Sequence, residues 1–299
     1  MCKLNPKVDF AFKKLFGSEE NKSLLIAFIN SVISEENKIE NIHLKKECVS
    51  TIRNIQLKTP YNISNYRKGK MTILDIKAVD EKGVWYDIEM QIAEQGFYDK
   101  RAFYYWSKVY SDQIESGNDF DLLRKTIGIN ILDFNYLKEE DFHNVYKVYN
   151  EKTKEEFTDL FEMHFIELNK FKKNYGDLKT GLDRWVSFLN RAYEIDKDKI
   201  PKELEEDENI KKAIEKLDIM YLDKEEREIY ENDLKTLRIH KAEIKTAEEK
   251  GIEKERRQLI VKQYKKGLSV EYIADINDFE VEYVKNVVEV KQYINYVVA

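Results

Sequence analysis

Apolar and polar positions repeat along this chain with two different periods, and the period changes before residue 40. Apolar residues recur at helical spacing in residues 7–16 and 21–33, so both runs predict helices, and Asn21 suits the N-cap of the second. From residue 39 to residue 57, apolar residues alternate with polar ones, which is typical of extended chain. The chain therefore opens with two helices followed by extended structure.

The clearest strand signals lie in residues 71–79 and 84–92, on either side of a short turn that contains Gly83. Two β-rich runs joined by such a turn predict a hairpin. Further elements are expected downstream: an aromatic helix over residues 97–115, strands over residues 127–132 and 160–171, and a helix over residues 184–193. The first two-thirds of the chain thus mixes helices with strands.

After residue 196 the composition changes, because aromatic residues become rare and lysine and glutamate dominate. Glutamate and lysine pairs at helical spacing predict exposed helices in this region. Short helices are then expected over residues 258–266, 270–276 and 280–294, with Ser269 as an N-cap, in a helix-turn-helix rhythm. The last helix carries several acidic residues, which suit contact with phosphate poorly, so DNA contact and a packing or dimerisation role both stay open.

These changes divide the chain of 299 residues into three expected parts, namely residues 1–195, 196–257 and 258–299. The formal net charge of −6 counts against a protein that coats nucleic acid through bulk charge. A local basic groove is still compatible with that charge. Residues 41–74 carry seven basic residues against the single acid Glu47, namely Lys45, Lys46, Arg53, Lys58, Arg67, Lys68 and Lys70. A solvated surface is the alternative interpretation of this basic run.

Cysteine, histidine and hydropathy patterns exclude several other classes of protein. Cys2 and Cys48 are too few for a disulfide framework or a metal cage, and the first residues lack a signal-peptide core. No stretch approaches the ~20 apolar residues that span a bilayer, so we expect a cytoplasmic protein without a membrane partner. The 4 histidines form no metal-ligand pair at helical spacing, and His164 in its apolar run is expected to be a core or edge residue.

The hairpin carries the chemistry that the sequence suggests. Asp75 lies in the middle of the first apolar strand, and Glu89 and Gln91 point to one face of the second. Burying carboxylates among apolar residues is costly unless they are paired or bound to metal. Two converging carboxylates suit a hard cation such as Mg²⁺, which can activate water and stabilise charge on a phosphate. A cross-strand ion cluster on a wetted face, formed with Lys77, is an equally weighted alternative.

A resemblance to a known family changes that balance. Blocks occur in order along residues 5–190, among them NPKVDFAFKKLFGSEENKSLLIAFINSVI, ILDIKAVDEKGVWYDIEMQ, FYDKRAFYYWSKVYSDQIESGNDF, INILDF and HFIELNKF. On these blocks the chain resembles the Rpn family of recombination-promoting nucleases, also described as PD-(D/E)XK nuclease family transposases. The resemblance implies an α/β fold: a restriction-endonuclease-like mixed sheet flanked by helices. An all-α C-terminal region is expected to follow it.

The resemblance also assigns roles to the hairpin residues. Asp75 and Glu89 match the Asp and Glu of the family motif, so the resemblance implies that they bind the metal together with the backbone carbonyl of Met90. Gln91 stands where many superfamily members carry lysine, although Rpn-like sequences commonly have glutamine there. Because glutamine carries no charge, we infer that Lys77 supplies the missing cation.

Three further sets of residues are candidates for the site. An acid on the first helix joins the site in many superfamily members, and Asp9 is the first candidate, ahead of Glu19 and Glu20. A charge that merely complements the helix dipole is the alternative for Asp9. Lys100 and Arg101 are candidates for holding phosphate, with simple solvation as the alternative. The aromatic run at residues 103–106 is expected to be core rather than a platform for base stacking.

Together these features predict a Mg²⁺-dependent DNA endonuclease that hydrolyses phosphodiester bonds and is linked to DNA recombination or mobile elements. Its catalytic residues are expected to be Asp75, Glu89, Gln91 and Lys77. Its partner is DNA, and a homodimer is left open. The alternative is a DNA-binding or assembly protein that keeps the fold but has lost turnover, and a less favoured third reading is a hydrolase that acts on RNA.

Overall fold

The computed structural model of the chain describes residues 4–39, 51–58, 76–93, 96–196, 199–217 and 222–297. The chain divides into two compact units, Met1–Leu237 and Arg238–Ala299, which are described separately below. The predicted strand over residues 71–79 is described only from Ile76 onward, and its first part, including Asp75, lies outside the described residues.

A mixed β-sheet forms the centre of the first unit. Its six strands in the described residues follow the order β1-β2-β3-β4-β6-β5. They are β1 (Ile55–Leu57), β2 (Ile76–Asp80), β3 (Trp85–Gln91), β4 (Thr126–Leu132), β5 (His143–Tyr149) and β6 (Glu156–Glu167). The pairs β1–β2, β2–β3 and β5–β6 are antiparallel, whereas β3–β4 and β4–β6 are parallel. The predicted hairpin is therefore confirmed in its described part, while β5 was not predicted from the sequence.

The turn between β2 and β3 is fixed by one aspartate and one glycine. Asp80 Oδ1 accepts hydrogen bonds from the backbone N–H groups of Lys82 and Val84, each at 2.9 Å. Gly83 has φ +83°, a left-handed conformation that a residue without Cβ adopts at little cost. This local chemistry holds β2 and β3 in a register that pairs Ile76 with Ile88 and Lys77 with Asp87.

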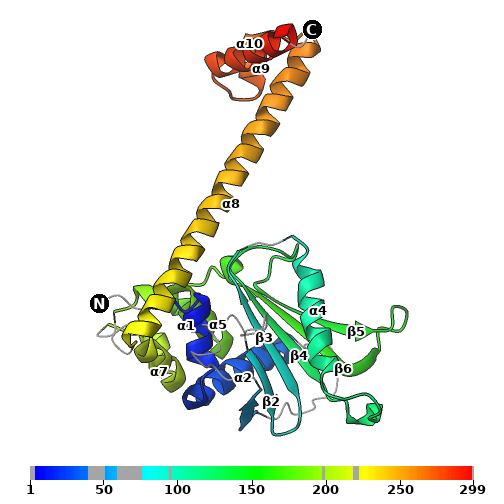
Figure 1. Ribbon diagram of the computed structural model, residues 1–299, viewed down its shortest axis with the longest axis vertical. Coiled ribbons are helices and arrows are strands. Elements are labelled where there is room, and N and C mark those ends of the chain that lie inside the picture. Colours follow the sequence, from blue (N-terminus) through cyan, green and yellow to red (C-terminus); the bar gives the residue numbers. More distant parts are fainter. Residues whose placement is uncertain are drawn as a thin grey trace. The chain divides into compact units, whose positions relative to one another are not determined.

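Helices cover both faces of the sheet (Figure 1). On one face lie α1 (Asp9–Phe16), α2 (Lys22–Ile39) and α5 (Gly181–Arg191), and their apolar residues form one core with Tyr86, Ile88 and Met90 of β3. Helices α6 (Lys202–Glu205) and α7 (Glu208–Lys216) add to this core. On the other face lies α4 (Tyr98–Ser111), which packs against β4 and β6. We name these the α1 face and the α4 face of the sheet.

The pattern along α4 shows why it packs against the sheet. Its buried residues recur at spacings of three and four, which places them on one side of the helix: Tyr98, Ala102, Tyr105, Trp106 and Val109. The indole N–H of Trp106 donates to the backbone carbonyl of Thr126 at 2.8 Å, which ties the helix to the start of β4. The position of α4 over the sheet determines which polar groups of β3 and β4 its side chains can reach.

The second unit is helical. Helix α8 (Lys224–Lys265) begins before the unit boundary and runs on without a break, which corrects the prediction of a separate helix over residues 258–266. Helices α9 (Val270–Ile276) and α10 (Val281–Val297) follow as predicted, and the side chain of Ser269 caps α9. The core that they share with α8 consists of aliphatic residues: Ile260, Ile273, Ala274, Val284, Val287 and Val288. Among the helices that the structure describes, none is long and apolar enough to cross a membrane.

Candidate functional site

Glu89 lies in the middle of β3, on the α4 face of the sheet. Its side chain is 3% exposed, and strand alternation gives it the same face as Asp87 and Gln91. The parallel register with β4 places Asn130 beside it. A carboxylate at such a depth needs charged or hydrogen-bonding neighbours, because burial without them is costly.

Arg101 supplies a positive charge at Glu89. Its Nη2 atom lies 3.8 Å from Oε2 of Glu89, and its guanidinium lies 5.3 Å from the centre of the Tyr105 ring. Helix α4 holds both Arg101 and Tyr105 one turn apart, so the same helix that covers the face also places the cation there. Arg101 was predicted to contact phosphate, and its position beside Glu89 places that candidate next to the predicted metal ligand.

A buried series of hydrogen bonds that was not predicted from the sequence lies beside Glu89. The hydroxyl of Tyr98 donates to Oδ1 of Asn130 at 3.0 Å, and Nδ2 of Asn130 donates to the carbonyl of His164 at 3.2 Å. Tyr98 is 1% exposed and Asn130 is 3% exposed, so these hydrogen bonds lie in the protein interior. An asparagine in the interior of the mostly apolar strand TIGINIL was the available signal.

Gln91 lies at the end of β3, on the same face as Glu89. Its Nε2 atom donates to the carbonyl of Ala93 at 3.3 Å, and its backbone carbonyl accepts from the N–H of Asp133 at 2.9 Å. Asp133 also pairs with Lys7 at 2.8 Å, which ties the N-terminal segment to this end of the sheet. The Lys7–Asp133 pair was not predicted from the sequence.

Lys77 lies on β2 opposite Asp87, and therefore on the α4 face. Its Nζ atom is 3.3 Å from Oδ2 of Asp112 and 5.1 Å from the centre of the Trp85 ring. The structure thus places Lys77 on the face that carries Glu89 and directs its ammonium group toward Asp112. A catalytic role for Lys77 stays a prediction.

Two of the remaining predicted site residues are the acids Asp75 and Asp9. Asp75 lies outside the described residues; it directly precedes Ile76, whose partner in β3 is Ile88. Asp9 pairs with Lys13 at 2.9 Å in the first turn of α1, a helix of the α1 face.

The reserve acids form ion pairs elsewhere, and Lys100 stays exposed. Glu19 pairs with Lys22, Glu20 pairs with Lys216 at 3.2 Å, and Lys100 is exposed with Nζ 4.6 Å from the centre of the Phe97 ring.

Only some of the predicted metal ligands lie in the described residues. In the part of the chain that the structure covers, no group of three or more His, Cys, Asp or Glu residues could hold a metal ion. Of the predicted ligands, Glu89 and the backbone of Met90 lie in β3, whereas Asp75 lies outside the described residues. The carboxylate of Glu89 is a hard oxygen ligand of the kind that Mg²⁺ prefers.

A comparison with family models identifies the family. The model of the PD-(D/E)XK nuclease family transposases matches residues 6–247, which is well over half of the chain. The chain belongs to this family. Comparisons with curated proteins and with solved structures give no match.

Family membership fits the architecture described above. The mixed sheet flanked by helices and followed by a helical region is the restriction-endonuclease-like fold of PD-(D/E)XK nucleases. Membership implies a nuclease-like function and DNA as the substrate.

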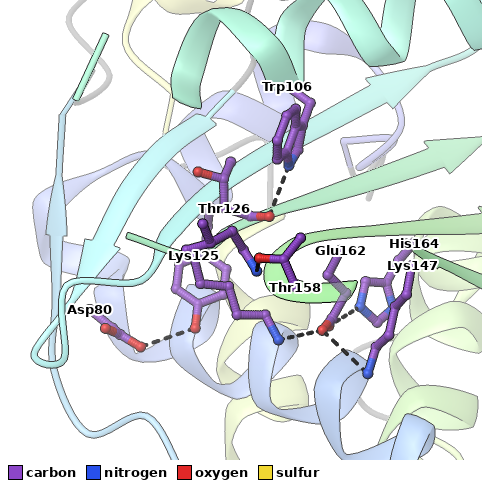
Figure 2. Close-up of polar contacts among 10 residues, drawn as sticks. Asp80, Trp106, Lys125, Thr126, Lys147, Thr158, Glu162 and His164 are labelled. Carbon is purple, nitrogen blue, oxygen red and sulfur yellow. Dashed lines mark hydrogen bonds and ion pairs between the residues drawn. The ribbon is translucent and has the colours of Figure 1, made fainter. Parts of the chain in front are cut away.

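This PD-(D/E)XK protein buries a second glutamate on the α1 face (Figure 2). Glu162 of β6 is 1% exposed; Lys125 Nζ donates to its Oε2 atom at 2.5 Å, and Nε2 of His164 lies 2.7 Å from its Oε1 atom. Lys147 adds a second lysine at 3.9 Å. Nδ1 of His164 in turn lies 2.9 Å from Nε2 of His143. His164 is fully buried, as expected for a core histidine.

The charges of this second cluster follow from its contacts. Burial by itself would raise the pKa of Glu162, but hydrogen bonds from His164 and Lys125 outweigh it and hold that pKa below its ordinary value. Burial, and then the nearby His164, lower the pKa of His143 to about 3. Glu162 is therefore ionised and His143 neutral over the whole physiological pH range. The cluster connects side chains of β5 and β6 within the protein interior.

Proposed function

We propose that this PD-(D/E)XK protein is a divalent-metal-dependent DNA endonuclease, linked to DNA recombination or mobile elements. The observation that carries the proposal is Glu89, a carboxylate that is 3% exposed in the middle of β3 in a chain of this family. Gln91 shares its face, and Arg101 lies 3.8 Å from it. A buried acid beside a cation that could hold phosphate is the arrangement that phosphodiester hydrolysis uses.

The cation would be held by Glu89, Asp75 and the backbone carbonyl of Met90. When bound, Mg²⁺ or another divalent cation supplies Lewis-acid stabilisation of the charge that develops on the phosphate. Asp9 remains a weaker candidate ligand, because its carboxylate pairs with Lys13 on α1.

The other residues would bind and orient the substrate. Arg101 would donate to a phosphate oxygen next to Glu89, since guanidinium groups bind phosphate in a planar, two-donor geometry. The amide of Gln91 would orient the attacking water, which an uncharged side chain can do by hydrogen bonding. Lys77 would add positive charge along the same face of the sheet.

Plasmid cleavage tests the proposal. Purified wild-type protein should nick or linearise plasmid DNA with Mg²⁺ and not with EDTA, and Asp75→Asn and Glu89→Gln should each abolish the cleavage. Glu156→Gln, at an exposed glutamate of β6, is the matched control and should cleave as the wild type does. Equal cleavage by the wild type, Asp75→Asn and Glu89→Gln would refute the site.

Two further readouts separate the remaining alternatives. Mg²⁺ should raise the melting temperature of the wild type but not of Glu89→Gln, because a ligand that binds only the folded state stabilises it. Tight DNA binding without any cleavage would favour the non-enzymatic alternative, and cleavage of RNA but not DNA would favour the third. Recombination frequency in cells that express wild type or Glu89→Gln tests the link to recombination.

A further inference from the structure

The outward side of α4 carries large aromatic side chains that stay mostly exposed, although the Phe103 ring also lies 5.5 Å from that of Phe161. Phe97 is 71% exposed, Phe103 is 55% exposed and Tyr104 is 57% exposed. Phenylalanine and tyrosine are weaker helix formers than alanine, lysine or glutamate, so helix formation does not explain them at outward positions. Exposed apolar side chains that lie together indicate an interaction surface.

A lysine lies among these rings. Nζ of Lys100 is 4.6 Å from the centre of the Phe97 ring, and Lys100, Phe103, Tyr104 and Asp99 line an open hollow of about 510 Å³. We name Phe97, Lys100, Phe103 and Tyr104 the aromatic–basic patch. Neither Lys100 nor Lys108, which is exposed two turns further along α4, forms an ion pair with any residue that the structure describes. Both charges are therefore available to a negatively charged partner.

One acid, Asp99, lines the hollow beside Lys100. With 100° per residue, Asp99 and Arg101 project about 200° apart around α4. The carboxylate of Asp99 accepts a hydrogen bond from the hydroxyl of Tyr136 at 2.7 Å, so it is occupied within the protein. The patch thus has an aromatic centre, and Lys100 lies among its rings.

The patch and the cation beside Glu89 lie on the same helix, α4. Arg101 follows Lys100 directly in the chain, and its guanidinium reaches Glu89 at 3.8 Å. A helix with its side chains measures roughly 10–12 Å across, so the patch lies within about one helix diameter of Glu89. A DNA strand bound at the patch would therefore lie near the helix that places Arg101 beside the predicted metal ligand.

We propose that the aromatic–basic patch binds unpaired nucleotides of a DNA strand, with bases stacked on Tyr104 and its neighbouring rings and a phosphate on Lys100. Aromatic rings combined with basic groups are the standard chemistry of single-strand binding, because every base has a face that can stack. The positive charge favours nucleic acid over a protein partner. The inference rests on the proposed function for its link to cleavage, and it specifies DNA with single-stranded segments as the substrate class.

Binding without metal tests the patch independently of cleavage. Fluorescence anisotropy with labelled oligothymidylate in EDTA compares the wild type with Phe103→Ala and Tyr104→Ala. The matched control is Phe120→Ala, at a phenylalanine of the same unit that is 81% exposed. We expect Tyr104→Ala to weaken single-strand binding roughly tenfold, with a smaller loss for a duplex of the same composition and none for Phe120→Ala.

The charge contribution has its own readout. Lys100→Gln should reduce the slope of log binding constant against log salt by about 0.7, the value for one phosphate contact on a single strand. Lys152→Gln, at an exposed lysine after β5, is the control and should leave that slope unchanged.

The outcomes separate this inference from the proposed function. Single-strand binding by Tyr104→Ala and Lys100→Gln equal to that of the wild type would overturn the inference, even if Glu89→Gln abolishes cleavage. A wild-type oligomer that Tyr104→Ala dissociates, with DNA binding unchanged, would overturn it in favour of a protein interface. Single-strand binding that depends on Tyr104, without cleavage by any variant, would support the patch while the nuclease proposal fails.

Discussion

Glu89 and Glu162 are both buried on strands of the same sheet, but on opposite faces and with different neighbours. Glu162 has Lys125 at 2.5 Å and His164 at 2.7 Å, which are the distances of charge-assisted hydrogen bonds. Glu89 has Arg101 at 3.8 Å, which is an ion pair beyond hydrogen-bond distance. Burial alone therefore does not identify a catalytic carboxylate; the distance and origin of the neighbouring cations distinguish a structural acid from a candidate ligand.

The largest expected difference between the two glutamates is in cleavage. Glu89→Gln should lower Mg²⁺-dependent plasmid cleavage by at least about a hundredfold, because it removes a charge that would stabilise the bound cation. Glu162→Gln should keep the wild-type rate per folded molecule. Initial rates, divided by the folded fraction from circular dichroism, measure both. The comparison breaks down if Glu162→Gln loses as much cleavage as Glu89→Gln.

The next difference is in stability, and its direction is reversed. Glu162→Gln should lower the free energy of unfolding by about 3 kcal/mol, because it leaves Lys125 and His164 without their shared buried anion. Glu89→Gln should cost less, since a residue that holds a cation for catalysis is placed for binding rather than for the stability of the fold. Urea unfolding of the first unit measures both values, with Glu156→Gln as the control. Equal losses for the two substitutions would contradict the assignment of different roles.

The Glu162 cluster should also make stability depend on pH. The pKa of His143 is lowered to about 3 in the folded protein, against 6.5 in the unfolded chain, so the unfolded state binds the proton first. The resulting stability is complete above pH ~6.5 and is lost as pH falls toward 3, by up to ~1.4 kcal/mol per pH unit.

His143→Gln is the variant that isolates this effect. Urea unfolding at several pH values between about 7 and 5 should give a flatter profile for His143→Gln than for the wild type, because one differential proton is removed. The lowered pKa of Glu162 acts in the same direction but only at more acidic pH. Parallel profiles for the two proteins would show that His143 is not the group that takes up the proton.

The smallest effects should distinguish the two cations of the α4 face. Arg101→Ala should slow cleavage roughly tenfold, because a positive charge beside Glu89 is lost. Lys77→Ala should slow it less, since its ammonium group lies at Asp112 and Trp85. Initial cleavage rates at saturating Mg²⁺ rank the two variants. Lys77→Ala as the more damaging change would restore Lys77 as the principal cation of the site.

The sequence by itself determined the local elements and the face of each strand residue. Alternation along residues 84–92 placed Glu89 and Gln91 together, and helical periodicity predicted α1, α4 and α5 within a few residues. It ended α2 at residue 33, whereas the helix continues to Ile39. These predictions succeed because strand and helix periods are local properties of the chain. Residues 143–149 were missed, since the β5 strand alternates weakly and lies at the sheet edge with much of its length exposed.

Only the tertiary structure decided which polar groups meet. The pairs Arg101–Glu89 and Tyr98–Asn130 join residues 12 and 32 positions apart, and they depend on how α4 crosses the sheet. The aromatic run at residues 103–106 shows the same limit. The sequence predicted it as one core cluster, but the helix turns 100° per residue, so Tyr105 and Trp106 are buried while Phe103 and Tyr104 are exposed. Periodicity shows which residues share a side of an element; packing against the rest of the chain decides whether that side faces the core or the solvent.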